Sequence, residues 1–405
     1  REGKRMNIYD RIKTMSDEMA GDLTAQRRDF HKYAEPGWFE MRTSSIIARK
    51  LTELGYEVLV GDQVCKKDSR MGVPSEEKLE EQYERAVAQG ADPEFVKYTK
   101  GGMTGVIGIL RCGEGPTVAM RFDIDALGVF EEHDPGHRPA KEGFNSVNEG
   151  FMHACGHDCH IAMLLGGIRM LMSQKESLKG NVKIIFQAAE ESCHGAEYYV
   201  KHGFLDDVDA IYGTHIWGDL DAPYMNFESG PRMASCDNFR IEVEGISAHG
   251  STPHQGVDAI LTAAHIITEI QAIVSRMNDP LNPLVVTVGK ITGGQRFNIL
   301  ADKVIMEGTT RTHSPEMRKK TEPLLRKIVE NTADSMGAKA TLTFEYFPAP
   351  IINDHEDLVQ IARNAATKIY GPDALKPFPK MMISEDFAYF MAVSYTHLRA
   401  HETSL

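Results

Sequence analysis

The spacing of hydrophobic residues in the first half of the chain predicts strands that alternate with helices. Residues 117–125 alternate apolar and polar side chains, which is typical of a strand, and this strand ends in carboxylates. Apolar runs at residues 182–186 and 209–213 predict two further strands, and residues 160–172 predict a buried helix. This alternation predicts a mostly parallel α/β sheet, which binds ligands at the carboxyl ends of its strands.

The pattern changes after residue 236, where strand, helix, strand, strand, helix and strand follow one another. This is the order of a ferredoxin-like unit, which we expect to be inserted into the first domain. Its predicted elements are residues 239–246, 257–277, 284–291, 303–311, 315–336 and 339–347. A helix at residues 357–369 then returns the chain to the first sheet. We therefore expect residues 1–235 and 348–392 to form the first domain and residues 236–347 to form the inserted one.

The composition excludes several classes of function. Of the 405 residues, 42% are hydrophobic and 25% are charged, which predicts two or three globular domains. There are 45 lysine and arginine residues against 58 acidic ones, and the net charge of −13 repels phosphate backbones and anionic membranes. No apolar run approaches the ~20 residues that span a bilayer. We expect no nucleic-acid partner and no membrane partner.

The cysteines and the start of the chain predict the cellular setting. Six cysteines in a chain of this length are too sparse for a disulfide scaffold, and no signal peptide is recognisable. Both observations favour a reducing, cytoplasmic setting. The chain begins with Arg1, so we expect the natural start at Met6 or upstream.

The densest group of metal-ligand residue types is MHACGHDCH, from Met152 to His160. The thiolate of Cys155 and the imidazole of His157 can converge on one divalent ion across the turn at Gly156. Mixed sulfur, nitrogen and oxygen ligands favour zinc, manganese or a neighbouring transition metal. The alternative is a hydrogen-bonded polar turn in which Cys155 is a small core side chain.

Two adjacent carboxylates, Glu190 and Glu191, follow the strand predicted at residues 182–186. One of them can ligate a metal while the other acts as base toward a metal-bound water. His215 follows the next predicted strand and can add a neutral nitrogen ligand. The alternatives are a surface charge pair and a hydrogen-bonded core histidine. The sequence contains no nucleophile elbow, HExxH motif, Walker A loop or dinucleotide-binding GxGxxG.

Taken together, these motifs resemble the M20-type metal-dependent amidohydrolases and peptidases, in the branch with the auxin-conjugate and hippurate hydrolases. The matches run in order from about residue 27 to residue 390, which makes the resemblance specific. They are RRDFH at 27–31 with Glu35 and Glu40, DIDAL at 123–127, HACGHD at 153–158, QAAEE at 187–191, GTH at 213–215, SAH at 247–249, PH at 253–254, GG at 293–294 with Asn298, TRT at 310–312 and SEDF at 384–387.

The resemblance implies a site for two divalent metal ions, zinc or manganese, in which Glu190 is the general base and acid. The implied ligands are Cys155, His157, Glu191 and His215. The inserted domain would be a lid and dimerisation domain, whose His249 reaches the partner subunit's active site and stabilises the oxyanion. Asn298 and Arg311 would hold the substrate. The guanidinium of Arg311 suits a substrate carboxylate, with a surface ion pair as the alternative.

Two segments bear on the substrate and on the end of the chain. Residues 66–101, with a predicted helix at 75–90, resemble an insertion found in p-aminobenzoyl-glutamate hydrolases, which favours p-aminobenzoyl-glutamate as substrate. Residues 393–405 match nothing in the family, whose members continue with a further strand, a helix and a last metal-ligand histidine. We expect this tail to be foreign and the chain to be truncated and poorly active, with neither His397 nor His401 as a ligand.

We therefore expect a metal-dependent amidohydrolase that cleaves the amide bond of an N-acyl amino acid, as a homodimer or with a related subunit. A dipeptidase or a general aminoacylase is the alternative within the enzymes. A catalytically silent subunit that only binds substrate or a partner is the alternative outside them. Hydrolysis that depends on Glu190 distinguishes the enzyme from the silent subunit.

Overall fold

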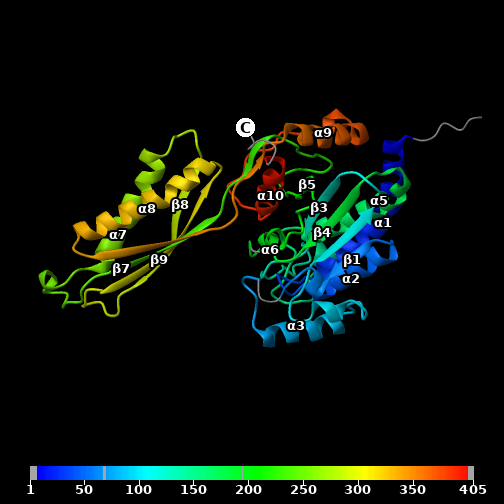
Figure 1. The fold of residues 1–405 in the computed structure, drawn as a ribbon. Coiled ribbons are helices and arrows are strands. Elements are labelled where there is room, and N and C mark those ends of the chain that lie inside the picture. Colours follow the sequence, from blue (N-terminus) through cyan, green and yellow to red (C-terminus); the bar gives the residue numbers. More distant parts are fainter. Residues whose placement is uncertain (1–6, 67–69, 194, 400–405) are drawn as a thin grey trace, which may run out of the picture. The chain divides into compact units, whose positions relative to one another are not determined.

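The computed structural model describes residues 7–66, 70–193 and 195–399 of the 405-residue chain (Figure 1). Parts of three predictions lie outside the described residues. They are the start at Met6, residues 67–69 of the insertion and residues 400–405 of the tail. The chain divides into two compact units. The first unit contains Arg1–Asn226, Ala362–Lys376 and Tyr389–Leu405, and the second contains Phe227–Ile361 and Pro377–Ala388.

A five-stranded sheet with the order β1-β2-β4-β3-β5 forms the centre of the first unit. Its strands are β1 (Glu57–Val60), β2 (Val106–Arg111), β3 (Thr117–Asp123), β4 (Asn181–Gln187) and β5 (Ala210–Gly213). Strand β3 pairs in parallel with β4 and β5, whereas β2 pairs antiparallel with β1 and β4. Four of these five strands therefore run in one direction, which confirms the predicted mostly parallel α/β sheet.

The first unit contains several helices. They include α1 (Ile8–Lys32), α2 (Met41–Glu53), α3 (Glu76–Ala88), α4 (Arg138–Glu142), α5 (His157–Ser173) and α6 (Gly195–Lys201). Of these, α1, α2 and α5 bury apolar side chains against this sheet. Phe30 of α1, Leu51 of α2 and Ile161 of α5 share one buried cluster with Phe186 of β4. Helix α3 lies where the sequence predicts it, and its N-cap Ser75 accepts a hydrogen bond from the backbone of Lys78 (3.4 Å).

The second unit contains a four-stranded antiparallel sheet with the order β10-β7-β9-β8. Its elements follow the predicted order: β7 (Asp237–Glu244), α7 (Ala259–Ala272), β8 (Leu284–Gly293), β9 (Lys303–Thr312), α8 (Pro315–Ser335) and β10 (Lys339–Tyr346). A π-helical turn, Ile273–Met277, continues α7 to the predicted end of that helix. Both helices cover the same face of the sheet (Figure 1) and share its buried core.

After β10 the chain forms one more strand, and no described strand after residue 347 joins the five-stranded sheet. Strand β11 (Ile351–Asn353) pairs instead with β6 (Gly230–Met233). Since β10 and β7 are antiparallel with Tyr346 opposite Asp237, the chain leaves β10 beside the residues that precede β7, where β6 lies. Helix α9 (Glu356–Tyr370) then leads into the first unit, which also contains most of α10 (Ala388–Arg399). None of the described helices has the length and apolar character to cross a bilayer.

Candidate metal centre

Polar side chains of the first unit gather at the carboxyl ends of β3, β4 and β5. Because these three strands are parallel, their carboxyl ends lie at the same edge of the sheet. The turn that leads into α5 reaches the same edge, where Cys155 supplies a thiol and His157 an imidazole. The residues brought together are Asp123, Asp125, Cys155, His157, Glu190, Glu191 and His215. The four predicted metal ligands and the predicted base are among them.

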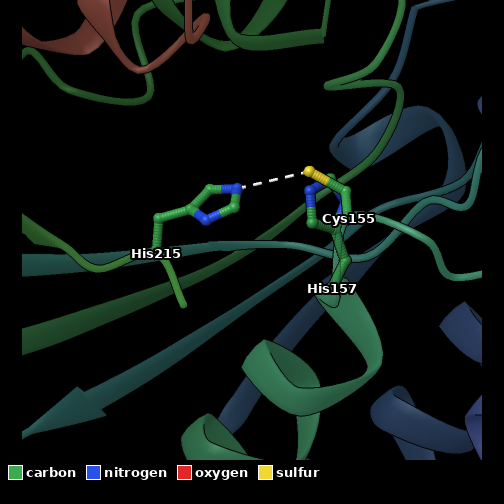
Figure 2. A group of neighbouring side chains, drawn as sticks. All are labelled: Cys155, His157 and His215. Atoms are coloured by element: carbon green, nitrogen blue, oxygen red, sulfur yellow. Dashed lines mark hydrogen bonds between the residues drawn. The ribbon is translucent and has the colours of Figure 1, made fainter. Parts of the chain in front are cut away.

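A glycine turn sets the positions of Cys155 and His157. Gly156 is the N-cap of α5 and has a φ of +86°, in the left-handed region that favours glycine. A Cβ atom at this position would lie 2.4 Å from Cδ1 of Ile216. Figure 2 shows Cys155 and His157 on one side of the site, facing His215, with Cys155 Sγ 3.4 Å from His215 Nε2.

Backbone carbonyls fix the protonation of both histidines. His157 Nδ1 lies 2.9 Å from the carbonyl oxygen of Asp125, and His215 Nδ1 lies 2.5 Å from that of Ile216. A carbonyl oxygen only accepts, so in each ring Nδ1 carries the proton and donates it. In its neutral form each ring therefore keeps a lone pair on Nε2, the nitrogen that faces the other site residues. This arrangement is typical of metal-ligand histidines.

The carboxylates meet His157 on the same side. Its Nε2 lies 3.7 Å from Glu191 Oε1 and 3.9 Å from Glu190 Oε2. His157 Nε2 and Glu191 Oε1 are buried and have no hydrogen-bond partner among the described residues. Buried polar atoms without partners are costly, so a cation that binds both would remove the cost. One sulfur, two nitrogens and carboxylate oxygens form a donor set that fits zinc or manganese.

The electrostatics of the site also favour a bound cation. Burial, followed by the charge of Asp125, raises the pKa of Glu191 to about 7. Burial raises the pKa of the Cys155 thiol above its ordinary value, although the nearby imidazole of His157 opposes this effect. Thiols and carboxylates ligate metals in their deprotonated forms, and a nearby divalent ion lowers the pKa of both. These residues therefore fit a metal centre.

The sequence did not assign a role to His160, which supports the centre from α5. Its Nδ1 hydrogen-bonds Asp123, and its Nε2 accepts a hydrogen bond from the backbone of Ile216 (2.9 Å). Asp123 also pairs with Arg121 (2.8 Å). His160 therefore connects the end of β3 to the loop that carries His215. A signal was available, because positions 157 and 160 are three apart and share one face of a helix.

Comparison with known proteins identifies the family. Residues 119–399 match peptidase family M20/M25/M40. The chain belongs to this family. This M20 chain is 39% identical over 280 residues to the N-acetyl-L-cysteine deacetylase of Bacillus subtilis (strain 168), with 69% of this chain and 64% of that protein covered. The aligned part thus spans less than two thirds of that relative.

Two further relatives bear on the chemistry of the site. A p-aminobenzoyl-glutamate hydrolase subunit of Escherichia coli (strain K12) is 36% identical over 323 residues, which cover 79% of this chain and 73% of that protein. Among solved structures, the Bacillus subtilis YXEP protein is described as a dinuclear metal-binding peptidase from the M20 family. It has a TM-score of 0.70 and 29% identity and covers 93% of this chain and 87% of that one.

Three of the predicted site residues of the M20 chain lie in the second unit. His249 forms an isolated bridge with Ile299, and the backbone N–H of Gly250 donates to the carbonyl of Asn298 (2.8 Å), so His249 and Asn298 are neighbours. Arg311 of β9 donates to the hydroxyl of Thr309 (2.9 Å) and forms no ion pair within the described part of the chain.

Proposed function

We propose that this M20 chain is a metal-dependent amidohydrolase that cleaves the amide bond of an N-acyl amino acid, with p-aminobenzoyl-glutamate as the favoured substrate. The convergence of Cys155, His157, Glu191 and His215, with Glu190 beside them, carries the proposal. These four residues would ligate two divalent ions, zinc or manganese. The name of the YXEP relative supports a dinuclear centre.

The residues divide the chemistry between them. The metal ions, when bound, would lower the pKa of the attacking water and polarise the amide carbonyl. Glu190 takes the proton of that water and returns it to the leaving amine, as general base and then general acid. The residue is 6% exposed, so it is shielded from competing bulk water. Glu191, the next residue, serves as a ligand.

We assign the binding of the substrate to the second unit, with residues 236–347 as a lid and dimerisation domain. His249 Nδ1 accepts a hydrogen bond from the backbone of Ser251 (3.2 Å), so the neutral ring carries its proton on Nε2. That N–H can donate to the oxyanion of the partner subunit's substrate in a homodimer or in a heterodimer with a related subunit. Asn298 and Arg311 would hold the substrate, with the guanidinium on its carboxylate.

Further observations bear on the substrate and on the setting. The insertion that resembles those of p-aminobenzoyl-glutamate hydrolases is built around α3, and one of the relatives bears that name. The name of the N-acetyl-L-cysteine deacetylase supports a general aminoacylase as the second candidate. All six cysteines are free thiols, which supports a reducing, cytoplasmic setting.

A panel of substrates tests the proposal. Hydrolysis of p-aminobenzoyl-glutamate, N-acetyl amino acids, hippurate and dipeptides is compared with Zn²⁺ and with Mn²⁺. We expect the highest kcat/KM for p-aminobenzoyl-glutamate and no turnover after chelation. A preference for dipeptides or for simple N-acetyl amino acids supports one of the two alternative enzymes. Metal binding without hydrolysis of any of these amides supports the silent subunit.

A further inference from the structure

The loop between α1 and α2 contacts the turn that carries Glu190 and Glu191. A Cβ atom on Gly37 would lie 3.1 Å from both Cα and Cβ of Ala189, so the two backbones pack closely. Ala189, directly before Glu190, has a φ of +55°. This left-handed conformation is unfavourable for alanine, and the surrounding structure must hold it.

Two buried carboxylates hold the backbone on either side of Glu190. Glu40, which is 0% exposed, accepts a hydrogen bond from the backbone N–H of Ala189 (2.8 Å). Its other oxygen accepts from the hydroxyl of Thr104 (2.6 Å). Asp125 accepts from the backbone N–H of Glu191 (3.0 Å). The residues before and after Glu190 are therefore both tied to carboxylates from other parts of the unit.

Residues of the insertion also contact the loop between α1 and α2. The indole N–H of Trp38 donates to the carbonyl of Met71 (2.9 Å). Arg85 of α3 pairs with the fully buried Glu35 (3.5 Å), which also accepts from the backbone N–H of Thr43 (2.8 Å). The ends of this loop are thus fixed by α3 and by the start of α2.

We propose that Glu40 is a positioning residue that holds Ala189 in its left-handed conformation and thereby aims Glu190 and Glu191 into the metal centre. The insertion keeps the loop of Glu40 in place. The catalytic consequence rests on the proposed function, which makes Glu190 the base and Glu191 a ligand. The structural consequence, protection of the Ala189 amide, does not depend on it.

Two substitutions at Glu40 separate the reach of the side chain from its charge. Glu40→Gln keeps the length, so its carbonyl can accept from Ala189 while its NH₂ group donates to Thr104. Glu40→Asp keeps the charge but is one methylene too short to reach both partners. We expect kcat to fall about 100-fold in Glu40→Asp, with KM within about threefold, because small displacements of catalytic groups cost about this much. Glu40→Gln should stay within about threefold of the unaltered chain.

Hydrogen–deuterium exchange provides a readout that does not require activity. The peptide that contains Ala189 should exchange at least ten times faster in Glu40→Asp than in the unaltered chain. Its exchange rate should be unchanged in Glu40→Gln. Unchanged exchange and kcat in Glu40→Asp would overturn the proposal, as would equal losses in both variants. If Glu40→Asp does not fold, the hydrogen bond between Thr104 and Glu40 is removed instead with Thr104→Val, and Thr104→Ser is the control that keeps it. Only Thr104→Val should then accelerate the exchange of the Ala189 amide. Equal exchange in those two variants overturns the proposal.

A double-mutant cycle with Glu190→Gln separates this inference from the proposed function. If Glu40 acts through Glu190, Glu40→Asp should add little to the loss already caused by Glu190→Gln. Additive losses overturn the positioning role. An active Glu190→Gln overturns the role of Glu190 as base, and the exchange of the Ala189 amide then still decides whether Glu40 holds the turn.

Discussion

Replacing Glu190 by glutamine tests the proposed mechanism directly. The amide keeps the shape of the carboxylate, and because the residue is buried the side chain has little room to move. It cannot take up a proton at neutral pH. A general acid–base group contributes about 10²–10⁴-fold to the rate, so kcat should fall by that factor. This corresponds to about 2.7–5.4 kcal/mol of transition-state stabilisation, at about 1.36 kcal/mol for each factor of ten.

The same variant decides which glutamate is the ligand. The distances from His157 Nε2, 3.9 Å for Glu190 and 3.7 Å for Glu191, are too similar to separate the two roles. Glu191 offers the unpartnered buried oxygen, and its N–H is held by Asp125. We therefore expect Glu190→Gln to keep its metal and Glu191→Gln to lose affinity for it.

The assay combines initial rates of p-aminobenzoyl-glutamate hydrolysis with metal content after dialysis, measured on both variants and the unaltered chain. A fall in kcat of less than about tenfold in Glu190→Gln would refute its role as base. Loss of metal in Glu190→Gln, with retention in Glu191→Gln, would exchange the two roles.

Other parts of the site give three further predictions. Cys155→Ala should lower metal affinity at least about tenfold and make activity depend on added metal. The control Cys112→Ala, which lies beyond the end of β2, should change neither property. Equilibrium dialysis measures the metal affinity of both variants. Arg311→Lys should reduce hydrolysis of carboxylate substrates far more than of their amidated analogues, and equal losses would indicate a structural arginine. Gly156→Ala should lower both the thermal midpoint and the metal affinity, because Gly156 has a φ of +86° and an added Cβ would lie 2.4 Å from Cδ1 of Ile216. An unchanged thermal midpoint and metal affinity would contradict the role of this turn.

Local patterns predicted the secondary structure well, because burial on one side imposes a period of two or 3.6 residues. Several elements begin and end within three residues of the predicted positions. They are the strands β4 and β8–β10 and the helices α3, α8 and α9. The prediction missed the first turn of α5, which begins at His157 rather than at residue 160. That turn carries polar site residues, so the apolar pattern that marked the helix starts only after it.

Long-range contacts were beyond the reach of such patterns. Glu40 and Ala189 are 149 positions apart, and nothing in either local sequence indicates that one accepts a hydrogen bond from the other. His160 similarly connects Asp123 and Ile216, which lie on opposite sides of it in the sequence. The local motifs supplied the candidate ligands and the resemblance to the M20 family assigned their roles, whereas their supporting contacts became visible only when the strand order was known.

The concentration of acids in the centre couples metal binding to the stability of the first unit. Asp123, Asp125, Glu190 and Glu191 meet at one edge of its sheet, and like charges this close oppose folding. A ligand that binds only the folded state stabilises it by about 2.7 kcal/mol at 100 times its Kd. Chelation should therefore lower the unfolding transition of the first unit. The core of the second unit contains none of the four proposed ligands, so its transition should not move. Calorimetry with and without Mn²⁺ measures the two unfolding transitions. The control is Glu191→Gln, which lacks one proposed ligand. An equal shift in that variant would show that the metal stabilises the chain elsewhere.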